Sequence, residues 1–486
     1  MKIQLLHEPE LQFDAGRHVD IRFGLMNYGP LDGPSDLAPK KIRVGLVGSA
    51  QSIEGMREWL LKCRNTIPAK ESTKRHLFPK FPGFAEDRAC YSELLLDPAL
   101  ERTLPATDFQ RICRVPNPDV LVVDAVNAFV SEMRVLAEKS ATDVLVCAVP
   151  TELLEALDPS VAEELEELHE DEQSEDARGP SSLDFHHLLK AKAMAVGQPI
   201  QIVLPPTYDP SKRRRQKGRR DRFRMLQDEA TRAWNFHVAL YYKAGGIPWR
   251  MIREPTDLET CFVGVSFYFT VDKKTVATSI AQVFNERGLG VVVRGGNATI
   301  TKDDRQPHLD DTSAFGLMTQ ALDRYRQEHR HLPARVVIHK TSSYSQPELD
   351  GFARAVQSQN VDSCDLLNLQ PSFKRLFRDG KYPPLRGTFL SLDDRHHILY
   401  TRGSVEFFST YPGLYVPRTL GIDCVQVNQT AKYLAQEILA LTKMNWNNAQ
   451  FDGGLPITIR AARQVGRILK YVGEGELVQS RYSYYM

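Results

Sequence analysis

The sequence lacks the cysteine pattern of a disulfide-rich or zinc-stapled protein. Its 486 residues include 7 cysteines, an odd number, and no two of them form a C-x-x-C pair. This pattern argues against a disulfide framework and a thiolate zinc site. No run of about 18 apolar residues occurs, so we expect no membrane span. The opening residues, MKIQLLHEPELQFD, are too soon interrupted by charge for a signal peptide. We therefore expect a protein of the reducing cytoplasm.

The net charge is small, but the charge is unevenly distributed. The formal net charge is +1, yet residues 163–176 contain nine acids and residues 212–224 contain nine bases. Blocks of one sign are usually solvated and partly disordered, and we read the acidic block that way. The basic block has a second reading, because clustered cations bind a phosphate backbone through counterion release. It could equally contact a protein partner.

The length predicts two to four folded units rather than one. We expect an extended N-terminal arm over 1–40. Over 41–254, apolar strands alternate with helices, which is the pattern of a Rossmann-like parallel α/β sheet. The expected strands are 41–49, 119–126, 143–150 and 200–205. The turn GLVGS is not G-x-G-x-x-G, so it predicts no dinucleotide site.

A C-terminal α+β region is expected over 255–486, with strands first and helices last. Such an order, with strands joined largely as hairpins, suggests an α+β unit of ribonuclease H type. The expected strands are 262–269, 290–296, 335–343, 386–392, 396–404 and 405–410, and the expected helices are 431–444 and 456–472.

An anion site is the strongest candidate site of the region 41–254. Ser181 and Asp184 form an S-x-x-D helix start, and His186 and Lys190 then share one helix face. Gln201 stands on the following strand, and a second helix, expected over 228–249, brings Lys243 just before a glycine turn. Two ammonium groups, an amide and an imidazole that converge would bind a phosphate. The spacing is equally compatible with ordinary surface residues.

These segments resemble the Argonaute family. H-x-x-x-K, P-I-Q and YYKAGGIPW are similar to its middle (MID) domain, while FVGVSFYF, RVVIHKTSS and LTKMNWNNAQFDGGLPITIRAARQVGRILKYV are similar to its PIWI domain. The resemblance implies a MID domain over 41–254 and a PIWI domain over 255–486. It implies that His186, Lys190, Gln201 (rather than Gln198) and Lys243 hold the 5′ phosphate of a guide strand. It also implies Mg²⁺ there, with the C-terminal carboxylate of Met486 as a ligand.

The same resemblance locates the metal ligands of cutting family members. The first acid would fall at Ser266, the second at Thr341, and the last on the C-terminal helix at Ala461 or Ala462. A two-metal nuclease needs charged ligands, so we expect no catalytic residue and no slicing. Asp257 and Asp272 lie nearby but off the required strand position. The candidate contacts to the nucleic-acid backbone lie at strand ends or on the last helix and are Arg294, Lys340, Arg402 and Arg460.

The motif NYGPLDG and the length resemble the short prokaryotic branch of the family. That branch implies a guide RNA, a single-stranded DNA target from plasmid or phage, and a heterodimer with an APAZ effector protein. The effector would carry a sirtuin-like, TIR or nuclease module and act in antiviral defence by abortive infection. Two alternatives remain: an active guide-directed nuclease with atypical acids, and a scaffold that binds no nucleic acid.

Overall fold

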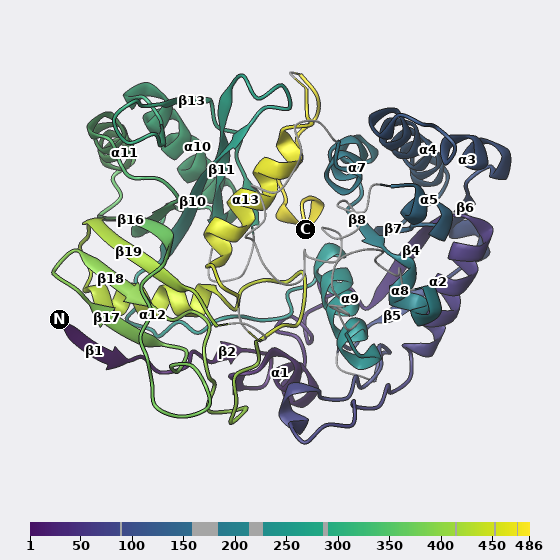
Figure 1. Cartoon of the computed structure of the whole chain (residues 1–486), viewed down its shortest axis with the longest axis horizontal. Coiled ribbons are helices and arrows are strands. Elements are labelled where there is room, and N and C mark those ends of the chain that lie inside the picture. The colour runs from purple at the N-terminus through teal and green to yellow at the C-terminus, as the bar shows by residue number, and fades with distance from the viewer. Residues whose placement is uncertain are drawn as a thin grey trace. The chain divides into compact units, whose positions relative to one another are not determined.

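The computed structural model describes residues 1–87, 90–157, 183–212, 227–284, 290–413, 416–451, 453–473 and 475–486, with backbone alone at 279–284. Its internal contacts define two compact units (Figure 1). The first unit comprises Met1–Gly24, Trp249–Gly473 and Gln479–Met486, and the second comprises Leu25–Pro248 and Glu474–Val478. This division falls a few residues before the expected boundary at 254, and it assigns the first 24 residues to the unit that follows residue 248.

The second unit contains a sheet in which every pairing is parallel. Its strand order is β5-β4-β7-β8, and β6 also pairs with β4. The strands are β4 (Lys41–Gly48), β5 (Glu93–Leu95), β6 (Glu101–Thr103), β7 (Val144–Ala148) and β8 (Ile200–Val203). The parallel α/β class expected for this part of the chain is confirmed.

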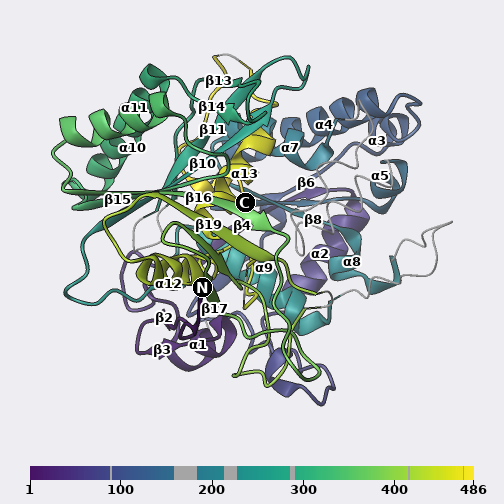
Figure 2. The ribbon, with the colours of Figure 1, turned by 60° about the vertical axis from the view of Figure 1, so that its left-hand side comes forward.

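Helices cover both faces of this sheet. Figures 1 and 2 show α3, α4 and α7 on one side and α2, α8 and α9 on the other. The helices are α2 (Ala50–Lys62), α3 (Ala106–Ile112), α4 (Pro118–Lys139), α5 (Thr151–Ala156), α7 (Phe185–Ala193), α8 (Pro205–Tyr208) and α9 (Glu229–Lys243).

The strand expected over 119–126 is wrong, because these residues form the first turns of α4. Asn117 caps that helix by accepting from the backbone N–H groups of Asp119 and Val120, and Pro118 occupies its first position. Both features start helices. The apolar run that suggested a strand is instead the buried face of a helix 22 residues long.

The first unit is built on an 11-stranded mixed sheet of order β1-β17-β18-β19-β16-β15-β10-β11-β13-β14, with β12 paired to β11. Its centre, β10-β15-β16, is parallel, so the expectation of mainly hairpin connections is wrong there. The strands are β1 (Lys2–Leu5), β10 (Thr260–Phe269), β11 (Val276–Phe284), β12 (Gly290–Val292), β13 (Asn297–Ile300), β14 (Pro307–His308), β15 (Arg335–Lys340), β16 (Ser363–Ser372), β17 (Thr388–Ser391), β18 (His396–Leu399) and β19 (Thr419–Gln426).

The helices of this unit are α10 (Asp311–His329), α11 (Gln346–Ser358), α12 (Ala431–Leu441) and α13 (Ile457–Leu469). Two of them, α10 and α11, interrupt the strands and pack on each other, which the expected order did not include. Helix α13 packs on β10 and β11. Gly264 permits this contact, because a Cβ there would lie 2.1 Å from the carbonyl oxygen of Thr458.

Two further expectations are corrected. The arm over 1–40 is not simply extended: it contains β1, β2 (Leu11–Gln12), β3 (Arg17–His18) and α1 (Ile21–Tyr28). Strand β1 pairs with β17, and β2 pairs with β3 and with β9 (Arg250–Met251). Residues 405–410 form a turn closed by a single bridge from Val405 to Thr410 rather than a strand.

Some of the sequence features lie outside the described residues. These include the acidic block 163–176 and all of the basic block 212–224 except Lys212. Within the described ranges, no helix has both the length and the apolar character that a membrane crossing requires.

Candidate anion-binding site

Helix α7 positions the first two candidate residues. Asp184 caps the helix by accepting from the backbone N–H of His187 at 2.9 Å, while Ser181 lies outside the described residues. His186 and Lys190 follow one turn apart, and both are buried. After a short 3₁₀ turn the chain reverses at Gly197, whose φ of 85° is the left-handed conformation that glycine adopts at helix ends.

Lys243 and Gln201 meet from different elements. Lys243 is the last residue of α9, Gln201 lies on β8, and the Lys243 Nζ donates a hydrogen bond to the Gln201 Oε1. The exposed fractions of Lys190 and Lys243 are only 4% and 5%. The structure thus brings an amide and a buried ammonium group together, as the sequence predicted for Gln201 and Lys243.

Burial makes these cations costly. It lowers the pKa of Lys190 to about 7, and it lowers the pKa of Lys243 well below its ordinary value, with the charge of Lys190 adding to the effect. The pKa of His186 is also lowered well below its usual range, first by burial and then by Lys190. These mutual effects place the three side chains within electrostatic reach of one another. Among the described residues, Lys243 has no ion-pair partner. An anion bound here would restore both ammonium charges.

A loop from early in the sequence fixes the end of α9. The Asp32 carboxylate accepts from the Tyr241 hydroxyl at 2.7 Å and from the backbone N–H of Ile247 at 2.9 Å. Gly246 has no room for a side chain, because a Cβ would lie 2.2 Å from the Tyr241 ring. The motifs NYGPLDG and AGGIPW are therefore parts of one structure that holds Lys243 in place. Sequence reasoning missed the role of Asp32.

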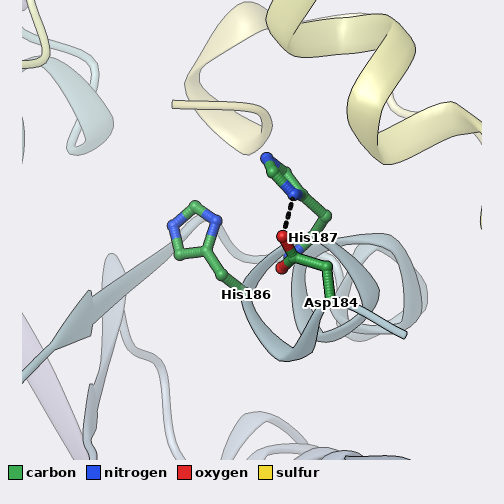
Figure 3. A group of neighbouring side chains, drawn as sticks. All are labelled: Asp184, His186 and His187. Carbon is green, nitrogen blue, oxygen red and sulfur yellow. Dashed lines mark hydrogen bonds and ion pairs between the residues drawn. The ribbon is translucent and has the colours of Figure 1, made fainter. Parts of the chain in front are cut away.

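Asp184, His186 and His187 form a group of possible metal ligands at the start of α7 (Figure 3). The Asp184 Oδ2 lies 2.8 Å from the His187 Nδ1, and the His186 Nδ1 has no hydrogen-bond partner in the part of the chain that the structure describes. The His187 imidazole and its backbone N–H both engage Asp184, which accounts for the pairing as a helix cap.

The predicted Mg²⁺ prefers several oxygen ligands, and the candidate site does not provide them. Of the four phosphate-binding candidates, Gln201 alone carries an oxygen, and that oxygen accepts from Lys243. Met486, the predicted ligand, is buried in the first unit, whereas the candidates belong to the second. The role of its carboxylate as a metal ligand stays a prediction.

The positions predicted to replace nuclease acids lie on adjoining elements. Strands β10 and β15 are paired up to Val265 and Lys340, and the Thr341 N–H donates to the Val265 carbonyl at 3.1 Å. Ser266 and Thr341 are therefore the next neighbours along these strands. Ala462 is fully buried on α13, the helix that packs on β10. The structure brings together the three elements that the prediction named.

Lys340, predicted to contact a nucleic-acid backbone, has a different role. Its Nζ lies 2.9 Å from the Glu348 Oε1, and both side chains are fully buried. Glu348 also accepts from the backbone N–H groups of Leu309 and Ser345. Because its charge is neutralised inside the protein, Lys340 does not fit the predicted contact.

The other backbone candidates differ in accessibility. Arg294 is exposed after β12. Arg402 and Arg460 are half-buried. Both guanidinium groups lie beside the glycine turn before α13, because a Cβ atom at Gly453 would lie 2.8 Å from Arg460 and a Cβ atom at Gly454 would lie 3.6 Å from Arg402.

The two acids near Ser266 in the sequence are engaged in local hydrogen bonds. Asp272 accepts from the Thr270 hydroxyl, and Asp257 accepts from the backbone N–H of Glu254.

No protein-family model and no curated protein matches this sequence. Solved structures do match its fold. Clostridium butyricum Argonaute bound to a guide DNA and a target DNA superimposes with a TM-score of 0.65 at 14% identity, over 98% of this chain and 53% of that one. A. aeolicus Argonaute gives a TM-score of 0.56 at 12% identity, over 99% of this chain and 54% of that one. Marinitoga piezophila Argonaute with a 5′ OH guide RNA gives 0.54 at 10%, over 100% and 59%.

These comparisons show an Argonaute-like fold, in agreement with the resemblance of the motifs. The chain spans only a little over half the length of the Argonautes that it matches. At this level of identity the likeness concerns the fold, so the roles of individual residues depend on the geometry described above.

Proposed function

We propose that this chain is a short Argonaute that binds the 5′ phosphate of a small guide RNA and does not cut the paired strand. The guide bases recognise complementary single-stranded DNA of plasmids or phages. Base pairing then supplies the sequence specificity, while the protein holds the backbones by shape and charge. The Clostridium butyricum neighbour, which holds a guide and a target together, supports this use of the fold.

The observation that carries the proposal is the burial of two neighbouring lysines, Lys190 and Lys243, the second of which contacts Gln201. A terminal phosphate would accept hydrogen bonds from both ammonium groups and from the Gln201 amide, and His186 would donate from its imidazole. The Lys243–Gln201 hydrogen bond positions both donors before the ligand arrives. Because the pKa of Lys190 is about 7 in the free protein, phosphate binding would be coupled to proton uptake above that pH.

The absence of cutting follows from the chemistry of Ser266, Thr341 and Ala462. Hydroxyl and methyl groups carry no charge to hold two divalent ions. Two acids contact residues that flank Thr341, but their oxygens are already engaged. Glu348 pairs with Lys340, and Asp304 accepts from the Ser343 hydroxyl at 2.8 Å.

The resemblance of the NYGPLDG motif to the short prokaryotic branch of the family supports a partner. We propose that an APAZ protein forms a heterodimer with this chain and carries the effector, an NAD-consuming sirtuin-like or TIR module or a nuclease. Target pairing would shift the complex to the state that activates the effector, as a coupling between distant sites. The outcome would be antiviral defence in the prokaryotic cell.

The phosphate site is tested with the double variant Lys190→Met, Lys243→Met. We expect the wild type to bind a 5′-phosphorylated guide much more tightly than the same strand with a 5′ hydroxyl, and the variant to bind both equally. Lys192→Met is the matched control, because Lys192 lies on the same helix but forms an exposed ion pair with Glu476 at 2.7 Å. Equal binding by the wild type, or preference for the hydroxyl end, would overturn the assignment.

The second test separates this proposal from its two alternatives. Wild-type protein, guide and complementary DNA are incubated with Mg²⁺ or Mn²⁺, and we expect intact DNA. Cleavage at a fixed distance from the 5′ end of the guide would identify a nuclease with atypical acids. Failure to bind any guide at low salt would favour a scaffold, since phosphate contacts strengthen as salt is lowered.

A further inference from the structure

The loop between β16 and β17 exposes aromatic and basic side chains together. Phe373 and Phe377 are 83% and 88% exposed, which is unusual for rings of this size. Lys374, Arg375 and Arg378 stand between and beside them, and all three are exposed. Apolar rings alone would not indicate which ligand covers them, but the interleaved charge does.

The cations of this loop outnumber its one acid, Asp379. Among the residues that the structure describes, no ion pair is formed by Lys374, Arg375, Arg378 and Lys381 of the loop or by Arg418 before β19, although many other surface bases of the chain form one. The Arg418 guanidinium lies 5.7 Å from the centre of the Phe373 ring, so charge and ring share one surface. An unpaired cationic surface fits a polyanion better than a neutral protein face.

The backbone of this loop is fixed by contacts at its middle and at both ends. The backbone N–H of Leu376 donates to the hydroxyl of the buried Tyr400 at 2.6 Å. At its far end, Arg386 is buried and pairs with Glu8 at 3.0 Å. At its near end, Ser372 is in register with Thr419 in the sheet. The exposed rings therefore stand on an anchored backbone, which lowers the entropic cost of binding.

We infer that the surface formed by Phe373, Lys374, Arg375, Phe377 and Arg378 binds single-stranded nucleic acid. Its two rings stack on unpaired bases, and its cations neutralise the adjoining phosphates. Stacking and backbone contacts of this kind are how proteins hold single strands without reading their sequence. The inference rests on the proposed function for its ligand, but it concerns a different unit from the terminal-phosphate site.

The test uses the full chain and a short oligothymidine with a 5′ hydroxyl, so the terminal phosphate plays no part. Phe373→Ala with Phe377→Ala should weaken binding by about tenfold for each ring. The variant should bind an abasic strand of equal length as tightly as the wild type does, because that strand has no bases to stack. The control pair, Phe269→Ala with Lys274→Ser, changes an exposed ring and base in the β10–β11 hairpin and should leave binding unchanged.

The cationic half of the surface has its own readout. Replacing Lys374, Arg375 and Arg378 with serine should reduce the slope of log affinity against log salt by about 2, given roughly 0.7 per phosphate contact for single strands. Unchanged oligothymidine affinity in the ring variant, or an equal loss on the abasic strand, would overturn the inference. A wild type that lacks 5′-phosphate preference while the ring variant still loses affinity would instead reject the proposed function alone.

Discussion

Lys340 in the first unit and Lys243 in the second are both buried lysines, but their surroundings differ. Lys340 pairs with the buried Glu348, and this carboxylate supports its charge. Lys443, also in the first unit, is likewise paired, with Glu8 at 2.8 Å. Lys243 instead has Gln201 and a second lysine, Lys190, as its neighbours. In the first unit these buried lysines pair with acids, whereas in the second unit Asp184 supports the charge of Lys190 and Lys243 has no acid partner among the described residues.

The largest loss of stability is expected when the acid that neutralises the buried Lys340 is removed. Glu348→Gln leaves the Lys340 ammonium buried without its counter-ion, which typically costs about 3–5 kcal/mol. We expect this loss in the free energy of unfolding of the first unit, measured with urea. Asp304→Asn is the control for a more exposed acid and should cost much less. A loss below about 1 kcal/mol for Glu348→Gln would show that the two lysine environments are energetically alike.

Asp32 should couple stability to the anion site. Asp32→Asn removes a charged acceptor from Tyr241 and Ile247 and should cost about 2 kcal/mol. Because Asp32 fixes the loop after Lys243, the preference for a 5′-phosphorylated strand should fall as well. Tyr241→Phe removes a single hydrogen bond and should cost about 1 kcal/mol. If Asp32→Asn lost no stability and kept the full preference for the 5′ phosphate, the loop held by Asp32 would not support the anion site.

The ligand-free protein should become more stable as the pH rises above 7. The pKa of Lys190 is about 7 in the folded protein and near 10.4 in the unfolded chain, so the unfolded chain binds more protons between these values. Stability then increases by at most about 1.4 kcal/mol per pH unit from this lysine. Urea unfolding of wild type and Lys190→Met at pH 7 and pH 9 gives the difference. If the free energy of unfolding changed equally with pH in the two proteins, burial would not lower the pKa of Lys190.

Motifs and strongly apolar strands could be predicted from the sequence, because local patterns determine them. β4, β7, β8, β10 and β15 were found in this way. The helix α4 was mistaken in part for a strand, since a buried helix and a buried strand are both continuously apolar over eight residues. The cue that was missed is Asn117 followed by Pro118, a helix start.

In the candidate site, too, local patterns predict some side-chain contacts but not those that join distant parts of the sequence. The pairing of Gln201 with Lys243 could be predicted through a family resemblance, but the burial of Lys340 could not. Its acid, Glu348, belongs to α11, a helix that was not predicted from the sequence. The support from Asp32 is also non-local, because it joins positions 209 residues apart in the sequence.

The central claim is tested most directly by the affinity of the wild-type protein for one strand with a 5′ phosphate and with a 5′ hydroxyl, measured from pH 6 to pH 9. We expect a strong preference for the phosphate near pH 7, where the phosphate is mainly a dianion. The preference should decline toward pH 9, because Lys190 must take up a proton in order to bind. An affinity ratio near one at every pH would show that the protein does not recognise the terminal phosphate.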